Sequence, residues 1–208
     1  MTTPPRAEAD LLTALAAGPP DAPAVDLTAL ADAVAVRAWQ QGQVDVAVAG
    51  VGSPIGPLLL AATPAGLVRV AFAQEDTDAV LAELSARIGP RVVESGTLLD
   101  EPARQLAEYF DRRRRDFDLA LDLRLATRFR AGVLTALRRV GYGTTTSYAA
   151  LAAAAGRPAA VRAVGSACAT NPLPVVVPCH RVLRSDGGLG GYAGGLAAKR
   201  LLLATEAA

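Results

Sequence analysis

Residues 171–182 read Asn-Pro-Leu-Pro-Val-Val-Val-Pro-Cys-His-Arg-Val, an apolar run that ends in a cysteine and a histidine. The valines at 175–177 predict a buried strand. His180 is the only histidine in the chain. An unperturbed thiol, with a pKa of about 8.5, is only slightly ionised at neutral pH, so a nucleophilic Cys179 needs a base or a positive charge nearby.

Two interpretations of this Cys-His pair remain open. Adjacent residues on an extended strand point to opposite faces, so contact between the two side chains requires a turn or a bridging water. Otherwise Cys179 is a small buried apolar residue, the commonest state of a free cysteine, and His180 is an ordinary hydrogen-bonded histidine. Cys168 has no histidine beside it in the sequence, and we interpret it as a packing residue.

Composition limits the other chemistry. Two cysteines and one histidine in 208 residues are fewer than the four ligands of a structural zinc site, and their spacing is not that of a Cys-x-x-Cys redox centre. We therefore expect no metal. The longest uncharged run, residues 46–68, contains four glycines and three prolines, which argues against a membrane helix. The N-terminus lacks a basic-then-apolar signal pattern, so we expect a cytoplasmic protein without a membrane partner.

A glycine-rich loop follows the Cys-His pair, at Gly187–Gly195. It lacks the Gly-x-x-x-x-Gly-Lys-Ser/Thr pattern of a nucleotide-phosphate loop. We interpret it as a flexible pocket wall that holds Tyr192.

A helix pair precedes the Cys-His pair. Ser147 caps a predicted helix at 148–155, and Gly156-Arg157-Pro158 leads into another at 159–169, with helix-turn-helix spacing. The second helix consists mostly of small residues, with Arg162 as its only long polar side chain. Such a helix can approach a groove closely but offers few groups to read bases, which favours recognition of shape over sequence.

The first half of the chain mixes helices and strands. The expected helices lie at 7–17, 26–42, 77–88 and 100–113, and the expected strands at 44–48, 58–63, 67–73, 91–94 and 117–125. Thr63-Pro64-Ala65-Gly66 is a turn sequence that joins two of the strands as a hairpin. A further helix is expected at 127–140. We place domain boundaries after residues 42 and 120.

Charge separates the two halves. Residues 1–120 contain 10 arginines and 17 acidic residues, a net charge of −7, whereas residues 121–208 contain 11 basic and three acidic residues, a net charge of +8. A basic half is typical of a domain that binds a polyanion such as DNA, although a solvated surface would show the same pattern. The four arginines at 112–115 lie between acidic residues at an expected helix end, where cations are stabilised structurally.

The run Pro178-Cys179-His180-Arg181-Val182, with Asn171-Pro172 before it and the glycine loop after it, resembles the active-site signature of the O6-alkylguanine-DNA alkyltransferases, also called methylated-DNA–protein-cysteine methyltransferases. The resemblance extends from Ser53-Pro54-Ile55-Gly56 to Glu206. It implies an α+β protein. A ribonuclease-H-like α/β domain (43–120) would be followed by a winged-helix-like, minor-groove-binding domain (121–208), with 1–42 as an N-terminal helical extension outside the resemblance.

The resemblance also implies roles for individual residues. Cys179 would accept the alkyl group, and His180 would act as a base through a water molecule. Glu206 would orient the histidine. Asn171 would tie the helix-turn-helix to the active-site strand, and Tyr148 would give a proton to the departing guanine.

Two further groups of residues follow from it. Arg162 would fill the gap left by a flipped nucleotide, and the other expected DNA contacts are Ala163, Gly165, Arg181 and Tyr148. The expected pocket lining is Tyr192, Ala193, Val182 and Pro174. The chain departs from the family pattern at Arg130, where a glutamine is common, at Tyr142, which lacks the usual preceding proline, and at Ala193, where many relatives have serine.

The implied activity is stoichiometric transfer of the alkyl group from O6-alkylguanine, and from O4-alkylthymine, in double-stranded DNA to Cys179, by a monomer without a cofactor. Two alternatives remain. One is a non-catalytic alkyltransferase-like damage-binding protein, in which the cysteine is replaced. The other is a helix-turn-helix regulator with a structural cysteine.

Overall fold

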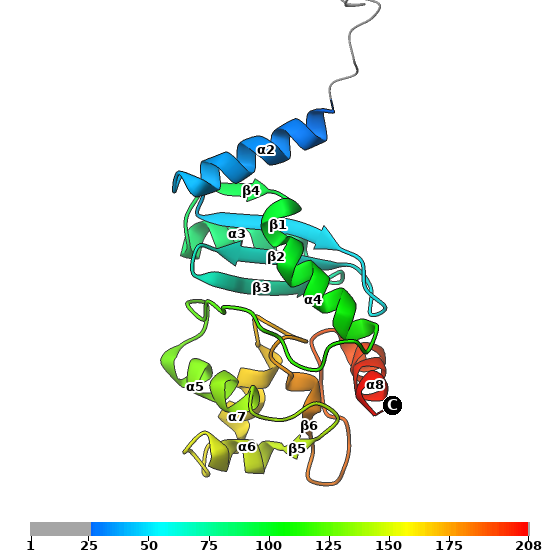
Figure 1. Cartoon of the computed structure of the whole chain (residues 1–208). Helices are drawn as coiled ribbons and strands as arrows, with labels where there is room; N and C mark the ends of the chain where they lie inside the picture. The colour runs from blue at the N-terminus through cyan, green and yellow to red at the C-terminus, as the bar shows by residue number, and fades with distance from the viewer. Residues whose placement is uncertain (1–25, 208) are drawn as a thin grey trace, which may run out of the picture.

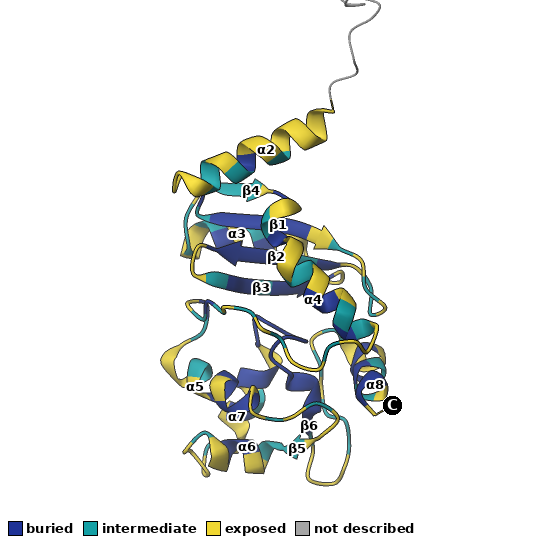
Figure 2. Ribbon diagram, in the orientation of Figure 1, coloured by how far each residue is buried: buried dark blue, intermediate teal, exposed yellow. Residues whose placement is uncertain are grey.

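Four strands form the sheet of the first domain in the order β3-β2-β1-β4. The computed structural model describes residues 26–207, and its strand bounds are β1 Val46–Val51, β2 Leu58–Thr63, β3 Gly66–Phe72 and β4 Val92–Glu94. β1 pairs antiparallel with β2 and parallel with β4. β2 and β3 form the expected hairpin, with an irregularity at Ala61/Ala62. Most strand residues are buried whichever side of the sheet they face, so neither face of the sheet is exposed to solvent (Figure 2).

Helices α3 (Thr77–Arg87) and α4 (Asp100–Phe110) lie on opposite faces of this sheet (Figure 1). α3 is capped by Asp76 and buries Val80 and Leu84 against one set of strand residues. α4 follows a 3₁₀ turn, η1 (Thr97–Leu99), and buries Leu106 and Tyr109 on the other face. Because α4 continues past the sheet toward the end of the chain, it is positioned to contact the second domain (Figure 1).

Helix α2 (Leu27–Gln40) lies beyond the edge strand β4 (Figure 1). Asp26 caps it, as expected, by accepting from the amides of residues 28 and 29. Leu27, Leu30 and Val34 share a face of this helix but are exposed. The helix expected at 7–17 lies outside the described residues.

The connection between the domains does not form the strand expected at 117–125. One isolated bridge links Leu67 with Leu121 beside β3. It is made by two backbone bonds, from Leu67 N–H to the Ala120 carbonyl and from Asp122 N–H to the Leu67 carbonyl. Leu119, Leu121 and Leu123 instead pack, partly buried, against the apolar cluster that contains Leu106 and Tyr109. Leu125 is buried in the cluster on the other face of the sheet. Burial of those side chains, and not a hydrogen-bond ladder, accounts for the alternation.

The second domain is mainly helical. Its elements are α5 Arg128–Leu137, β5 Thr146–Ser147, α6 Tyr148–Ala154, α7 Val161–Ala169, η2 Cys179–Arg181, β6 Val182–Leu183 and α8 Gly195–Glu206. Thr127 and Ser147 cap α5 and α6 with their side chains, which confirms both expected helix starts near those residues. The two short strands β5 and β6 pair in parallel. Within residues 26–207, no helix is long and apolar enough to cross a membrane.

The two domains share one core. A single apolar cluster contains sheet residues such as Leu60 and Val70 together with Leu134, Val164 and Val177 of the second domain. The amide of Val70 in β3 also donates to the carbonyl of Pro172 at 2.8 Å. The segment that leads to the Cys-His pair is therefore seated directly on the sheet of the first domain.

Candidate active site

Residues 171–178 form buried turns, which corrects the expectation of a strand at 175–177. The amide of Val177 donates to the carbonyl of Leu173 at 2.8 Å, as in a helical turn. Val175 has a φ of 71°, a left-handed conformation that β-branched residues rarely adopt. Prolines at 172, 174 and 178 supply no amide hydrogens for a ladder, so the valine run turns while remaining buried.

The turns continue into the 3₁₀ element η2, which begins at Cys179. With about three residues per turn, successive side chains diverge around the axis and do not alternate between opposite faces. Both Cys179 and His180 are therefore able to point inward, and they are 5% and 0% exposed. Because this segment is a 3₁₀ turn and not an extended strand, Cys179 and His180 need not face opposite sides.

Asn171 links the end of α7 to the cysteine. Its side-chain amide donates to the Val177 carbonyl at 2.8 Å and to the Cys179 Sγ at 3.2 Å. Its Oδ1 accepts from the amide of Leu173 at 3.0 Å. The whole side chain is thus satisfied inside the core, and it holds the turn that carries the thiol.

Both thiols are free and buried. Burial raises the pKa of Cys179 to about 11, against the opposing effects of the Asn171 hydrogen bond and the Lys199 charge. Burial, followed by the neighbouring Cys179, raises the pKa of Cys168 to about 12. Both sulfurs are therefore protonated at neutral pH in the DNA-free protein, and Cys168 lies in the core, as its packing interpretation requires.

His180 is held by a carboxylate on the last turn of α8. Its Nε2 lies 2.8 Å from Glu206 Oε1. Burial lowers the pKa of His180, although Glu206 opposes that shift. Burial alone would raise the pKa of Glu206, but hydrogen bonds from His180 and Arg181 outweigh it and lower that pKa to about 2. Glu206 is therefore ionised, and the other ring nitrogen of His180, Nδ1, is buried without a hydrogen-bond partner among residues 26–207.

Arg181 occupies a different place from the DNA contact expected for it. It is 5% exposed, and its guanidinium donates to Glu206 through Nε and Nη2, each at 2.9 Å. Its Nη1 donates to the carbonyl of Val140. A guanidinium so engaged neutralises the buried carboxylate and is not available to a phosphate.

Sequence reasoning missed two buried polar residues near this site, Lys199 and Tyr109. Lys199 is fully buried in α8, and its ammonium donates to the carbonyls of Val182 (2.7 Å) and Leu189. It thereby fastens β6 to the glycine-rich loop. Tyr109 comes from α4 of the first domain and donates its hydroxyl to Glu206 Oε1 at 2.7 Å. Both contacts involve α8, a helix that was not predicted from the sequence, so no local pattern indicated either of them.

Tyr192 packs between the two domains beside the histidine. Its ring makes edge contacts with Phe72 of β3 (centroids 5.6 Å apart) and with His180 (6.5 Å). Its hydroxyl is buried and, among residues 26–207, lacks a hydrogen-bond partner. Gly194 allows this packing, because a Cβ there would lie 2.6 Å from the Phe72 ring. Two buried polar atoms of neighbouring rings, the Tyr192 hydroxyl and His180 Nδ1, are thus without hydrogen-bond partners in the described part of the chain.

Apart from Arg181, the expected DNA residues lie together on the helix pair. An open pocket of about 890 Å³ is lined by Tyr148, Arg162, Arg184, Gly190 and their neighbours. Arg162 and Ala163 are exposed on α7, and Gly165, less exposed, faces the ring of Tyr148. Gly190 of the glycine-rich loop closes one side, since a Cβ there would meet the Tyr148 hydroxyl at 3.1 Å.

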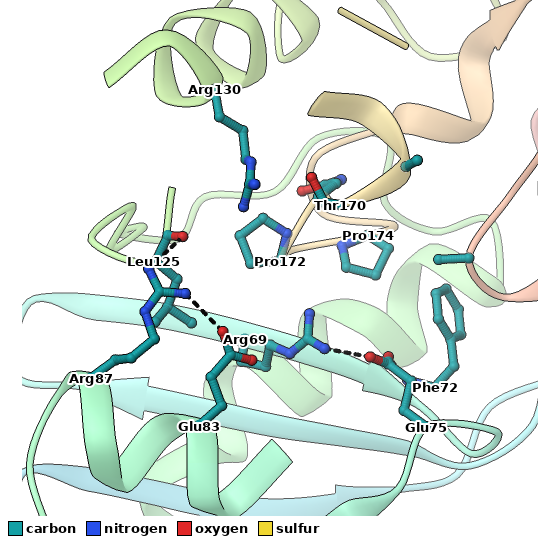
Figure 3. Close-up of a pocket in the computed structure, with 13 residues that line it drawn as sticks. Arg69, Phe72, Glu75, Glu83, Arg87, Leu125, Arg130, Thr170, Pro172 and Pro174 are labelled. Carbon is teal, nitrogen blue, oxygen red and sulfur yellow. Dashed lines mark hydrogen bonds and ion pairs between the residues drawn. The ribbon is translucent and has the colours of Figure 1, made fainter. Parts of the chain in front are cut away.

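The other expected pocket residues are distributed differently. Val182 is buried in β6, where its carbonyl accepts from Lys199. Pro174 and Ala193 line a second cavity, of about 400 Å³, between the two domains (Figure 3). Figure 3 shows Arg69 and Arg130 directed into it from opposite sides, with Arg69 paired to Glu75. This cavity backs the segment that carries the cysteine and is separate from the pocket on the helix pair.

Among residues 26–207, no group of three or more His, Cys, Asp and Glu side chains is arranged to hold a metal ion. The chemistry that the arrangement offers is that of a thiol, an imidazole with a fixed carboxylate, and an exposed arginine on a helix pair. Together with the fold, these features define a two-domain α+β protein with a cysteine-centred site and a helix pair that exposes Arg162.

Comparison with known proteins identifies the family. Residues 50–123 match the ribonuclease-like domain of 6-O-methylguanine DNA methyltransferase, and residues 128–208 match its DNA-binding domain. A methylated-DNA–protein-cysteine methyltransferase of Methanosarcina barkeri is 40% identical over 154 residues, which are 74% of this chain and 92% of that protein. One of Mycolicibacterium paratuberculosis is 48% identical over 102 residues, 49% of this chain and 61% of that protein.

Solved structures agree. The chain superposes with a TM-score of 0.67 on the Mycobacterium tuberculosis OGT determined in complex with DNA, at 36% identity and over 78% of this chain and 92% of that one. An O6-methylguanine-DNA methyltransferase from Pyrococcus kodakaraensis gives a TM-score of 0.57 at 27% identity, over 78% of this chain and 99% of that one. The chain belongs to the 6-O-methylguanine DNA methyltransferase family, which binds DNA and repairs its alkylated bases by direct transfer of the alkyl group to a cysteine.

Proposed function

We propose that this protein removes alkyl groups from O6 of guanine, and from O4 of thymine, in duplex DNA by transferring them to the Sγ of Cys179. It would act once per molecule, as a monomer, because the thioether formed is not hydrolysed by water. The second domain would approach the minor groove as a winged-helix-like module. The reaction would take place in the cytoplasm, where a free acceptor thiol stays reduced.

The transfer is a displacement at the alkyl carbon. The Cys179 proton leaves to His180 through a bridging water, and the thiolate forms a new S–C bond as the C–O bond to the base breaks. The electron pair of the C–O bond stays with the guanine oxygen. Tyr148 gives a proton to the departing base, which makes it a better leaving group. The products are S-alkylcysteine and unmodified guanine in DNA.

His180 and Glu206 supply the base in this proposal. Support comes from the 2.8 Å contact that fixes one ring nitrogen on an ionised carboxylate and leaves the buried Nδ1 free to take a proton. Asn171 supports the thiolate, because its amide already donates to Sγ at 3.2 Å and a donor stabilises the charged form. In the DNA-free protein burial outweighs the Asn171 hydrogen bond and raises the pKa of the thiol, so the proposal assigns its deprotonation to His180 during the reaction.

Access to the base requires that the damaged nucleotide leave the stack, at a cost of a few kcal/mol. Arg162 is exposed at the start of α7, among small residues that include Ala163 and Gly165. We assign to it the filling of the vacated space in the duplex. The open pocket of about 890 Å³ beside Tyr148 is the place proposed for the extruded nucleotide.

The single observation that carries the proposal is the turn at η2. It buries Cys179 directly before a histidine whose Nε2 is fixed by Glu206 and whose Nδ1 has no partner within the described residues. A damage-binding protein without transfer, or a regulator, has no need of that constellation.

The test is to incubate the protein with a duplex that contains one O6-methylguanine and to map the modified peptide by mass spectrometry. We expect at most one methyl group per molecule, on Cys179. Cys179→Ala should retain DNA binding and lose transfer, whereas the matched variant Cys168→Ala should transfer at the wild-type rate. Methylation of Cys168, repeated turnover, or DNA binding lost with Cys179→Ala in a folded protein would each contradict the proposal.

A further inference from the structure

Tyr109 brings the first domain into contact with the histidine–carboxylate pair. It lies on α4, is fully buried, and donates its hydroxyl to Glu206 Oε1 at 2.7 Å across a separation of 97 residues. Figure 1 shows the C-terminal end of α4 beside α8, the helix that ends at Glu206. The other donors to this carboxylate in the described part of the chain, Gly143, His180 and Arg181, all belong to the second domain.

The hydroxyl and the imidazole share one oxygen. Oε1 accepts from Tyr109 at 2.7 Å, lies 2.8 Å from His180 Nε2, and accepts from Arg181 Nη2 at 2.9 Å. A carboxylate oxygen has about two lone-pair sites, so three donors divide its charge. The hydrogen bond from the Tyr109 hydroxyl therefore weakens the electrostatic stabilisation that Oε1 gives to a protonated His180.

Packing and burial keep the Tyr109 hydroxyl in place as a hydrogen-bond donor. Its ring is surrounded by those of Phe110, Phe117 and Tyr142, with centroids 5.3, 5.4 and 6.1 Å away. Burial, and then the charge of Glu206, raise the pKa of Tyr109. The hydroxyl therefore keeps its proton at neutral pH and acts as the donor in its contact with Glu206.

Other titratable groups near this pair come from the second domain. Arg181 and Lys199 carry positive charge next to His180. Cys179 and Tyr192 lie near the pair with raised pKa values, and the Tyr142 ring packs against Tyr109. Arg181 is bound to both carboxylate oxygens, and Lys199 is bound to two backbone carbonyls. Neither cation can replace the hydrogen bond that Tyr109 makes to Oε1, because Lys199 already donates to two carbonyls and Arg181 already donates to this carboxylate.

We propose that Tyr109 is a positioning residue for the transfer reaction: its hydroxyl orients the Glu206 carboxylate and limits how tightly that carboxylate makes His180 hold a proton. The first domain would thereby set the basicity of the histidine in the second. The inference rests on the roles proposed above for Cys179 and His180.

The experiment uses Tyr109→Phe, which keeps the ring and removes the hydroxyl. With one donor fewer, Oε1 stabilises the imidazolium more strongly, so less His180 is available as a base at a given pH. We expect the acid limb of the single-turnover rate profile to move upward by about half a pH unit or more, which slows transfer about threefold on that limb. Because His180 is the sole histidine of the chain, its ring signal in NMR reports the same titration without DNA.

Tyr142→Phe is the matched control. That tyrosine donates its hydroxyl to the backbone carbonyl of Thr205 at 3.0 Å, one residue before Glu206, and not to the carboxylate. This control should lose about as much unfolding free energy as Tyr109→Phe does. Its rate profile and the titration of the histidine signal should not shift. If Tyr109→Phe moves neither readout, or if both variants move them equally, the assignment to Tyr109 is wrong.

A second substitution should shift the acid limb of the rate profile in the opposite direction. Replacing Tyr109 with 3-fluorotyrosine keeps the shape and strengthens the donor, so the acid limb should move to lower pH. This variant also covers the case in which Tyr109→Phe does not fold. Cys179→Ala is run in parallel: transfer by that variant would overturn the proposed function, whereas an unmoved profile with transfer confined to Cys179 would overturn the role of Tyr109 alone.

Discussion

Arg181 holds Glu206 through two parallel hydrogen bonds, from Nε to Oε2 and from Nη2 to Oε1, each 2.9 Å long. Both side chains are almost completely buried, at 6% and 1% exposure. A buried ion pair of this kind is costly to break, because removal of one member leaves the other charge without compensation. The pair joins the Cys-His segment to the end of α8.

Arg181→Met is expected to lower the free energy of unfolding by about 3–5 kcal/mol, since it leaves a buried carboxylate unpaired. Glu206→Gln should also be destabilising, because it leaves the buried Arg181 charge unpaired. The double variant should cost less than the sum of the two, because no unpaired charge then remains. Urea denaturation of the three variants measures this coupling. Strictly additive losses would mean that the two residues do not act as a pair.

Acid should destabilise the protein through Glu206. Its pKa in the folded protein is about 2, below its ordinary value of 4.5, so the folded form binds fewer protons between these values. This contribution is present above pH 4.5 and is lost as the pH falls toward 2. It amounts to on the order of 3 kcal/mol at most. Glu206→Gln should show a smaller loss over this interval in thermal or urea unfolding, and an equal loss would assign the effect to other groups.

The thiols should react late in a pH titration of the DNA-free protein. Because burial raises the pKa of Cys179 to about 11 and of Cys168 to about 12, the rate of alkylation by iodoacetamide should still be rising at pH 10. Cys179 should react before Cys168. In urea both should react near the ordinary pKa of about 8.5. A plateau below pH 8 in the folded protein would show that the free thiol is already activated.

Arg162→Ala should slow repair of duplex DNA by about tenfold or more, because the cost of extruding the nucleotide is then less well offset. Dealkylation of free O6-methylguanine, which needs no extrusion, should change little. Arg157→Ala is the control, because Arg157 is an exposed arginine of the turn before α7 and does not line the pocket beside Tyr148. Equal slowing of both substrates would remove Arg162 from this role.

Local sequence signals located most of the helices. Asp26, Thr127 and Ser147 each begin a helix by accepting from its first amides, and such caps depend on neighbouring residues alone. The hairpin of β2 and β3 was also predictable, since Thr63 to Gly66 form a turn between two apolar runs. In contrast, the alternation at 117–125 and the valines at 175–177 indicated strands that do not form, because burial against a distant surface produces the same patterns.

The order of residues by itself determined the chemistry available to this protein: one histidine beside a cysteine, too few ligands for a structural zinc site, and a basic half with a helix pair. Only the tertiary structure decided the geometry. It turned the chain at Cys179, buried Arg181 against Glu206, and brought Tyr109 from the first domain to the same carboxylate. These contacts join residues up to 97 positions apart, and no local pattern encodes which distant partner will satisfy a buried charge.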